Sequence, residues 1–171
     1  MKKFAISLLA ILFTFNLMAQ KYAYVDTEYI LSNIPTYESA QDQLDQLSIQ
    51  WQKEIETVYA EIDKMYREFQ AEKVLLTEEM RIKREEAIIN KEKEAKELQK
   101  KFFGKEGMLF KKRQELIKPI QDEIFNAIKA LAEEGSYAII FDTAASGLSI
   151  LFTDPRYDRS DAVLQKLGYK N

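Results

Sequence analysis

Two residue types that dominate enzyme chemistry are missing from this chain of 171 residues, which contains neither cysteine nor histidine. Their absence excludes thiolate nucleophiles, histidine general bases, disulfides and the usual zinc ligands together. Carboxylates remain, but no clustered acidic pair stands outside the charged helical runs, and no glycine-rich phosphate-binding loop is present. We therefore expect no enzymatic activity, no cofactor and no metal.

Glycine and proline are also scarce, at five and three residues. So few helix breakers exclude a disordered chain or a linker-rich array, and 31% charged with 46% apolar residues is typical of a long helical protein. The chain has 25 basic and 28 acidic residues, and the balance becomes 23 to 28 once the first twenty residues are left out. The part that follows them is therefore acidic.

The first twenty residues differ from the rest. Met1-Lys2-Lys3 gives a positive head, residues 4–15 an almost unbroken apolar run, and Ala19 a small residue suited to a peptidase cut. The run is too short to favour a membrane-spanning helix, which is the competing interpretation. We predict a cleaved signal peptide over residues 1–19 and export to the periplasm, without lipid attachment because no cysteine follows.

The centre of the chain, residues 37–132, has helical periodicity. Steps of three and four residues separate the apolar positions of its first half, which are Leu44, Leu47, Trp51, Ile55, Val58, Ile62, Met65 and Phe69. The series resumes at Ile88, Ala95, Leu98, Phe102, Leu109 and Leu116, and then at Ile120, Ile124, Ala127, Ile128 and Leu131. This pattern predicts two long helices with a reversal near residues 75–79, where Thr77 is suited to cap the second helix.

The charges favour folding these helices back on each other. Residues 38–80 hold four basic and eleven acidic side chains, whereas residues 81–118 hold thirteen and seven. Antiparallel pairing places the acidic and the basic helix side by side, while one continuous helical rod would separate their charges. The alternative of two solvated faces with an accidental bias stays open, because single exposed ion pairs contribute little.

Two stretches interrupt the helical pattern. At the reversal, Val74, Leu75, Leu76 and Met80 have no obvious core to enter, so they either pack on each other across the turn or contact something outside the chain. On the return helix, the glycines at 104 and 107 each cost about 1 kcal/mol relative to alanine, which predicts a local break or hinge.

Short β-rich runs flank the helices at residues 22–25, 137–141 and 148–152, and the last two are expected to form a hairpin. A brief helix over residues 28–33 should end at Pro35. The expected helix caps are Thr27, Thr36, Gly135, Ser160 and Gly168. Three short strands enclose no core by themselves, so we expect a sheet that copies from other chains complete.

In this order the parts resemble the Skp/OmpH family of periplasmic chaperones over essentially the whole chain after the signal peptide. The resemblance is carried by Tyr24-Val25-Asp26, Tyr137-Ala138-Ile139-Ile140-Phe141-Asp142, Ile150-Leu151-Phe152-Thr153-Asp154-Pro155, Tyr157-Asp158 and Ser160-Asp161-Ala162-Val163-Leu164. It implies a jellyfish-shaped homotrimer with an intermolecular β body and three helical hairpins around a cavity. It also implies holding of unfolded outer-membrane β-barrel proteins without ATP.

The expected fold is α+β and mostly helical, with a hairpin arm over residues 37–118 and a trimerisation body of residues 20–36 plus 119–171. Candidate client-binding residues are Tyr59, Tyr66, Phe69, Leu75, Leu76 and Met80. Candidate oligomerisation residues are Val25, Ile139, Phe141, Ile150 and Phe152. Each residue of the helical stripe has an alternative interpretation as hairpin core, because periodicity does not distinguish an inward face from a cavity face.

Charge separates this chain from the best-known members of that family, which are basic overall. Contact with lipopolysaccharide or a membrane surface would rest on the basic residues 81–118 alone. The alternative function is that of a structural or adaptor protein of the cell envelope. Nucleic-acid binding by the basic helix is disfavoured by the export signal and by the acidic partner helix.

Overall fold

The structure, a computed structural model, describes residues 20–145 and 150–169. The predicted signal peptide and part of the predicted strand at 148–152 lie outside the described residues. Two units are present: Ile34–Glu123, here called the arm unit, and the residues up to Asn33 together with those from Ile124, here called the sheet unit. No helix in the described ranges is long and apolar enough to cross a membrane.

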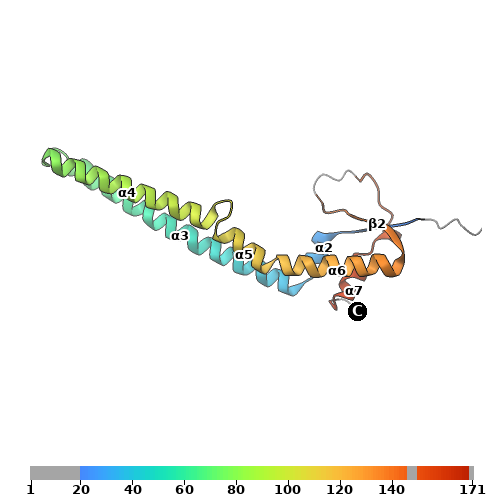
Figure 1. Cartoon of the computed structure of the whole chain (residues 1–171). Helices are drawn as coiled ribbons and strands as arrows, with labels where there is room; N and C mark the ends of the chain where they lie inside the picture. Colours follow the sequence, from blue (N-terminus) through green and yellow to red (C-terminus); the bar gives the residue numbers. More distant parts are fainter. Residues whose placement is uncertain (1–19, 146–149, 170–171) are drawn as a thin grey trace, which may run out of the picture. The chain divides into compact units, whose positions relative to one another are not determined.

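The arm unit is an antiparallel pair of long helices, as the periodicity predicts (Figure 1). Helix α3 (Pro35–Glu72) runs outward, and α4 (Glu78–Phe103) returns beside it, followed by α5 (Met108–Leu116). The next helix, α6 (Lys118–Gly135), begins in the arm unit and ends in the sheet unit. The expected α+β, mostly helical fold is confirmed.

The predicted apolar series forms the seam between these helices. Its buried members are Leu44, Trp51, Ile55, Val58, Ile62, Phe69, Ile88, Ala95 and Phe102. Around the middle of the seam, the Trp51 and Phe102 rings stack with centroids 5.1 Å apart and an interplanar angle of 3°. Phe103 meets Trp51 edge-on at 6.4 Å, so aromatic contacts reinforce the seam beyond the area that it buries.

The predicted break on the return helix is confirmed. Helix α4 ends at Phe103, Gly104 is its C-cap, and Gly107 is the N-cap of α5. A Cβ on Gly107 would lie 2.7 Å from the carbonyl oxygen of Phe102 and 2.8 Å from the amide nitrogen of Gly104. Close backbone approach therefore explains the glycine, whose φ of −70° any residue could adopt.

Two of the expected helix caps near the beginning of the chain differ from the structure. The first short helix ends before Pro35 as predicted, and Ile34 is extended, but Pro35 also begins α3, so the predicted cap at Thr36 is wrong. The ring of proline fixes φ near the helical value, which suits the first position of a helix. The cap of α2 (Thr27–Ser32) is Asp26 rather than Thr27, because its Oδ1 accepts the Tyr29 N–H at 2.9 Å. The cap at Thr77 is confirmed.

The sheet unit contains two strands, β1 (Lys21–Val25) and β2 (Tyr137–Asp142), which pair in parallel. The predicted antiparallel hairpin between β2 and residues 148–152 is wrong for its described part, since residues 150–152 form no strand. Instead, the end of β2 is held to β1: Thr143 donates from its N–H to the Val25 carbonyl at 2.8 Å. The chain therefore leaves β2 already bonded to β1.

Two short helical segments, η2 (Pro155–Tyr157) and α7 (Ser160–Lys166), complete the sheet unit. The predicted cap at Ser160 is wrong because Ser160 is inside α7, where its buried hydroxyl accepts the Asp26 N–H at 2.9 Å and donates to Asp158 Oδ1 at 2.7 Å. The other fully buried side chains of this core are Val25, Ile30, Val163 and Leu164.

The ends of α6 and α7 also differ from each other. Gly168 follows α7 with φ +83°, which confirms it as a C-cap glycine. Gly135 is instead the last residue of α6, and Ser136 takes the left-handed conformation with φ 53°. A Cβ on Gly135 would collide with the ring of Tyr137, so packing rather than conformation requires this glycine.

Candidate functional site

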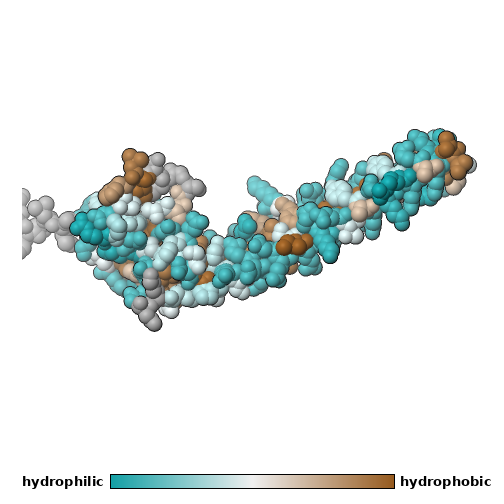
Figure 2. Space-filling view, turned by 180° about the vertical axis from the view of Figure 1, so that it is seen from behind, coloured by the Kyte–Doolittle hydropathy of each residue, from teal (hydrophilic) through white to brown (hydrophobic). Residues whose placement is uncertain are grey.

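The turn between α3 and α4 exposes apolar side chains at the end of the arm unit, where Figure 2 shows a hydrophobic cap. Val74 and Leu75 are 90% and 85% exposed, Met80 is half exposed, and Leu76 is partly buried. Of the two alternatives for these residues, packing on one another does not occur for Val74 and Leu75. A five-residue turn offers no second layer against which they could be buried.

Three ion pairs lie next to this apolar cap. Arg84 bonds Glu72 at 3.2 Å, Arg81 lies 3.4 Å from Glu78, and Lys83 lies 2.7 Å from Glu79. The three acidic groups around the turn are thus each matched by a basic one. Lys73, next to Val74, has its ammonium over the Phe69 ring instead, so the cap presents hydrocarbon beside one basic group.

The aromatic candidates on α3 divide into two kinds. Phe69 is only 5% exposed and lies in the seam, with the Lys73 ammonium 5.6 Å from its ring centre. Tyr59 and Tyr66 are close to half exposed. Phe69 is therefore available to a ligand only if the helices separate, whereas the two tyrosines are accessible as they stand.

Polar contacts cross the hairpin near Tyr66. Its hydroxyl donates to Glu92 Oε1 at 2.9 Å, and this hydrogen bond raises the pKa of the phenol above its ordinary value. Lys91 lies 2.9 Å from Glu61 across the hairpin and 3.1 Å from Glu94. These two bonds raise the pKa of the Lys91 ammonium. Both groups favour their protonated forms when the helices are paired.

The oligomerisation candidates lie in the sheet unit, and four of the five are exposed. Val25 is buried in the core, whereas Phe152 is 82% exposed and Ile139, Phe141 and Ile150 are about two-fifths to half exposed. Phe141, Ile150 and Phe152 line a cleft of about 770 Å³ with Tyr22, Tyr24, Tyr137, Tyr157 and Arg159. The sequence analysis did not single out the tyrosines and Arg159, although their density around the strands is a visible signal.

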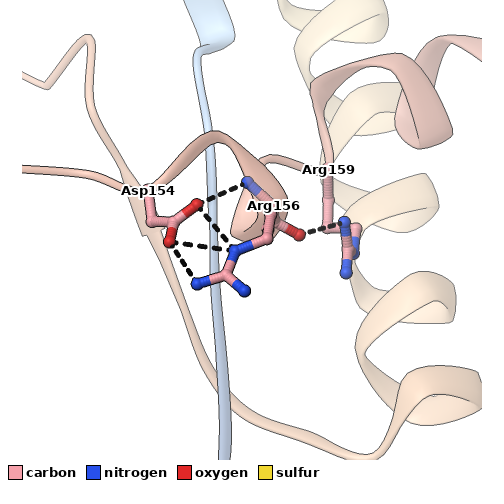
Figure 3. A network of polar contacts seen from close by, with 3 residues as sticks. All are labelled: Asp154, Arg156 and Arg159. Carbon is pink, nitrogen blue, oxygen red and sulfur yellow. Dashed lines mark hydrogen bonds and ion pairs between the residues drawn. The ribbon is translucent and has the colours of Figure 1, made fainter.

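A polar network fixes the loop that leads to α7 (Figure 3). Arg156 contacts the Asp154 carboxylate through Nε and Nη2, at distances down to 2.7 Å, and these bonds lower the pKa of Asp154. Arg159 donates from Nη1 to the Arg156 carbonyl at 3.0 Å and from Nε to the Tyr137 hydroxyl at 2.7 Å. The network anchors the loop to β2 and leaves the aromatic cleft beside it open.

The described residues contain no group of three or more acidic side chains that could hold a metal ion. Their notable surfaces are apolar: the exposed turn of the hairpin, the half-exposed tyrosines of α3 and the aromatic cleft of the sheet unit. These features define a helical-hairpin protein with a small α+β unit and surfaces suited to binding other chains.

A family model described as outer membrane protein (OmpH-like) matches residues 21–167. The chain belongs to this OmpH-like family, which confirms the resemblance found in the sequence. Its fold is similar to that of a candidate outer membrane chaperone (OmpH-like) from Caulobacter crescentus, with a TM-score of 0.67 and 12% sequence identity. The likeness covers 86% of this chain and 83% of that chain, and at this identity it concerns the fold alone. No curated protein matches the sequence significantly.

Proposed function

We propose that this protein is an ATP-independent holdase of the periplasm, which binds unfolded outer-membrane β-barrel proteins and prevents their aggregation in transit. Membership of the OmpH-like family supports the proposal. The observation that carries it is the apolar cap of Val74 and Leu75, which are the most exposed large aliphatic residues of the arm unit and have no partner among the described residues.

Such a surface suits a client without fixed structure. Burying a valine or leucine side chain fully contributes about 1.5–3 kcal/mol, so the cap of one arm binds weakly. Several weak contacts on separate arms can hold an unfolded chain without imposing one conformation on it. Tyr59 and Tyr66 extend the accessible apolar surface along α3, and Leu76 and Met80 complete the cap.

We further propose that the chain assembles as a homotrimer through a body made of residues 20–36 and 119–171, from which the arms of residues 37–118 project. Ile139, Phe141, Ile150 and Phe152 are exposed around a sheet of only two strands. Strands from other copies would cover them and satisfy the open sheet edge. In this proposal, residues 1–19 direct export and are removed near Ala19.

The test is to dilute a urea-unfolded outer-membrane β-barrel protein into the mature chain, with light scattering and native mass spectrometry as readouts. We expect a trimer that gains one client and suppresses its aggregation. Changing Val74 and Leu75 together to serine should weaken client holding while the assembly stays intact. The matched control is Val74→Ile with Leu75→Met, which keeps the cap apolar and should hold client as the unaltered protein does.

An assembly that does not bind the client, so that the client precipitates, would contradict the proposal. That result would favour the structural or adaptor role. Equal holding by the serine variant and its control would show that the cap is not the contact surface.

A further inference from the structure

The part of the arm unit that contains the Trp51–Phe102 stack carries an acidic stripe on α3. Glu38, Asp42, Asp45 and Glu56 are exposed and follow one another in steps of four, three and eleven residues, so they share one helix face. At about 100° per residue, this face points roughly 125° away from the buried series of Leu44, Trp51 and Ile55. The stripe is therefore on the outer side of α3, opposite its own hairpin partner.

The return side of the same part is basic. From Lys100 to Arg113 there are six basic residues and one acidic residue, Glu106. Lys100 and Lys111 each stand two positions from a seam residue, Phe102 and Leu109, which turns them roughly 160° away from the seam. Both are exposed.

These two charged sides do not neutralise each other within the chain. The ion pairs that cross the hairpin, Glu61 with Lys91 and Glu72 with Arg84, lie beyond the acidic stripe toward the turn. Within the described ranges, no side chain of the acidic stripe forms an ion pair. The same holds for five of the basic residues on the return side, which are Lys100, Lys101, Lys105, Lys111 and Arg113. The hairpin is thus electrically polarised across its width in this part, with acid on one side and base on the other.

Exposed apolar side chains accompany both sides. Ile49, which is 69% exposed, falls in the middle of the acidic stripe, four residues after Asp45. On α5, Phe110 and Met108 are exposed beside Lys111. Each side therefore combines several charges of one sign with apolar contact area, as the polar rim and apolar centre of a protein interface do.

We propose that the arms of neighbouring copies pack side by side in this part, with the acidic face of α3 in one copy against the basic face of α4 and α5 in the next. Each arm has one face of each kind on opposite sides, so the contact is head-to-tail and can close into a ring. A polyanion or an unfolded client of one charge would match only one face. A second copy matches both, which is why we assign the contact to it.

This inference rests on the assembly proposed above and adds a role for the charges that the holding function does not use. Exposed pairs contribute little individually, but several opposite charges in register orient two surfaces and exclude wrong partners. Screening over about 8 Å at physiological salt makes such a contact adjustable by ionic strength. The contact between arms would form at low salt and weaken at high salt.

The absence of cysteine from the chain makes the contact directly measurable. Asp45→Cys and Lys111→Cys, introduced together into the mature chain, place thiols on opposite sides of one arm, so a disulfide between them joins two copies. We expect covalent dimers and closed rings on mild oxidation at about 20 mM salt, with a yield roughly tenfold lower at about 1 M salt. Asp45→Cys alone should give few dimers, since like faces do not meet.

Charge reversal tests the assignment of the faces. In the two-cysteine background, changing Glu38, Asp42 and Glu56 to lysine should abolish the cross-link at low salt. Adding Lys100→Glu, Lys101→Glu and Lys105→Glu to the same chain should restore it. The matched control exchanges Asp63 and Arg67, which pair with each other within α3 at 2.8 Å, and should leave the yield unchanged.

Native mass spectrometry and client holding, measured on the same samples, separate the possible failures. An assembly that holds client but gives no cross-link, or a cross-link that charge reversal does not change, would overturn the inference and leave the proposed function in place. A chain that stays monomeric would overturn both. Reversal of the basic face alone that abolishes client holding but leaves the cross-link intact would assign that face to the client. This result would also overturn the inference.

Discussion

The arm unit and the sheet unit differ in where their apolar side chains are placed. In the arm unit, the seam of α3, α4 and α5 buries Trp51 and Phe102 against residues of the same chain. In the sheet unit, Ile139 and Phe152 remain exposed around a sheet of two strands. The difference indicates that the core of the arm unit is formed within one chain, whereas the sheet unit leaves apolar surface around its strands for a partner.

The variant with the largest expected effect tests the sheet unit, by disrupting the proposed assembly. Changing Ile139 and Phe152 together to lysine should convert the proposed trimer to monomers, because two charges would then enter the proposed interface. Native mass spectrometry gives the mass, and circular dichroism should show the helices retained.

The control for this prediction is Ile82→Lys, which alters an equally exposed apolar residue of α4. It should leave the assembly intact. An unchanged trimer in the double variant would mean that the exposed side chains of the sheet unit serve another purpose.

The next effect concerns the seam. Phe102→Ala removes the ring that stacks on Trp51, and large aromatic deletions in cores cost about 3–5 kcal/mol. We expect the free energy of unfolding of the arm unit to fall by about 3 kcal/mol. Urea unfolding followed by fluorescence measures it, since Trp51 is the sole tryptophan.

Phe110→Ala is the matched control for the seam, because Phe110 is half exposed on α5. It should change the stability by less than about 1 kcal/mol. Equal losses in the two variants would mean that the seam is not the main source of stability in the arm unit.

The smallest effect is a dependence on alkaline pH. The pKa values of Tyr66 and Lys91 are raised by their bonds to Glu92 and Glu61, so folding stabilises their protonated forms. Their contribution to the stability of the fold is complete below the pKa values of the unfolded chain, near pH 10. It is lost as the pH rises through the raised pKa values of the folded chain. Thermal unfolding between pH 9 and 11 should show a shallower decline for Tyr66→Phe with Lys91→Met than for the unaltered chain.

Much of the arm unit could be predicted from the sequence, because a helical seam leaves a period of three and four residues. The cap at Thr77 and the break at the glycines 104 and 107 could also be predicted, since capping and close backbone approach demand particular residue types. The start of α3 could not be predicted, because proline can both stop a helix and begin one, as Pro35 does here.

The pairing of the strands could not be read in the same way. Residues 137–141 and 148–152 are close in sequence, which favours a local hairpin, yet β2 pairs with β1. Among the candidate site residues, Tyr66 is accessible and Phe69, three residues later, is buried. Both belong to the same periodic stripe, and only the position of the facing helix distinguishes them.

The parallel pairing of β1 with β2 has a consequence for how the chain acquires its structure. Lys21 pairs with Tyr137, so more than a hundred residues separate the strands. A contact over such a span closes slowly when the intervening chain is disordered. Helix formation and collapse of the hairpin use local contacts and bring the two ends of that span together. We therefore expect the hairpin to fold first and the pairing of β1 with β2 to follow.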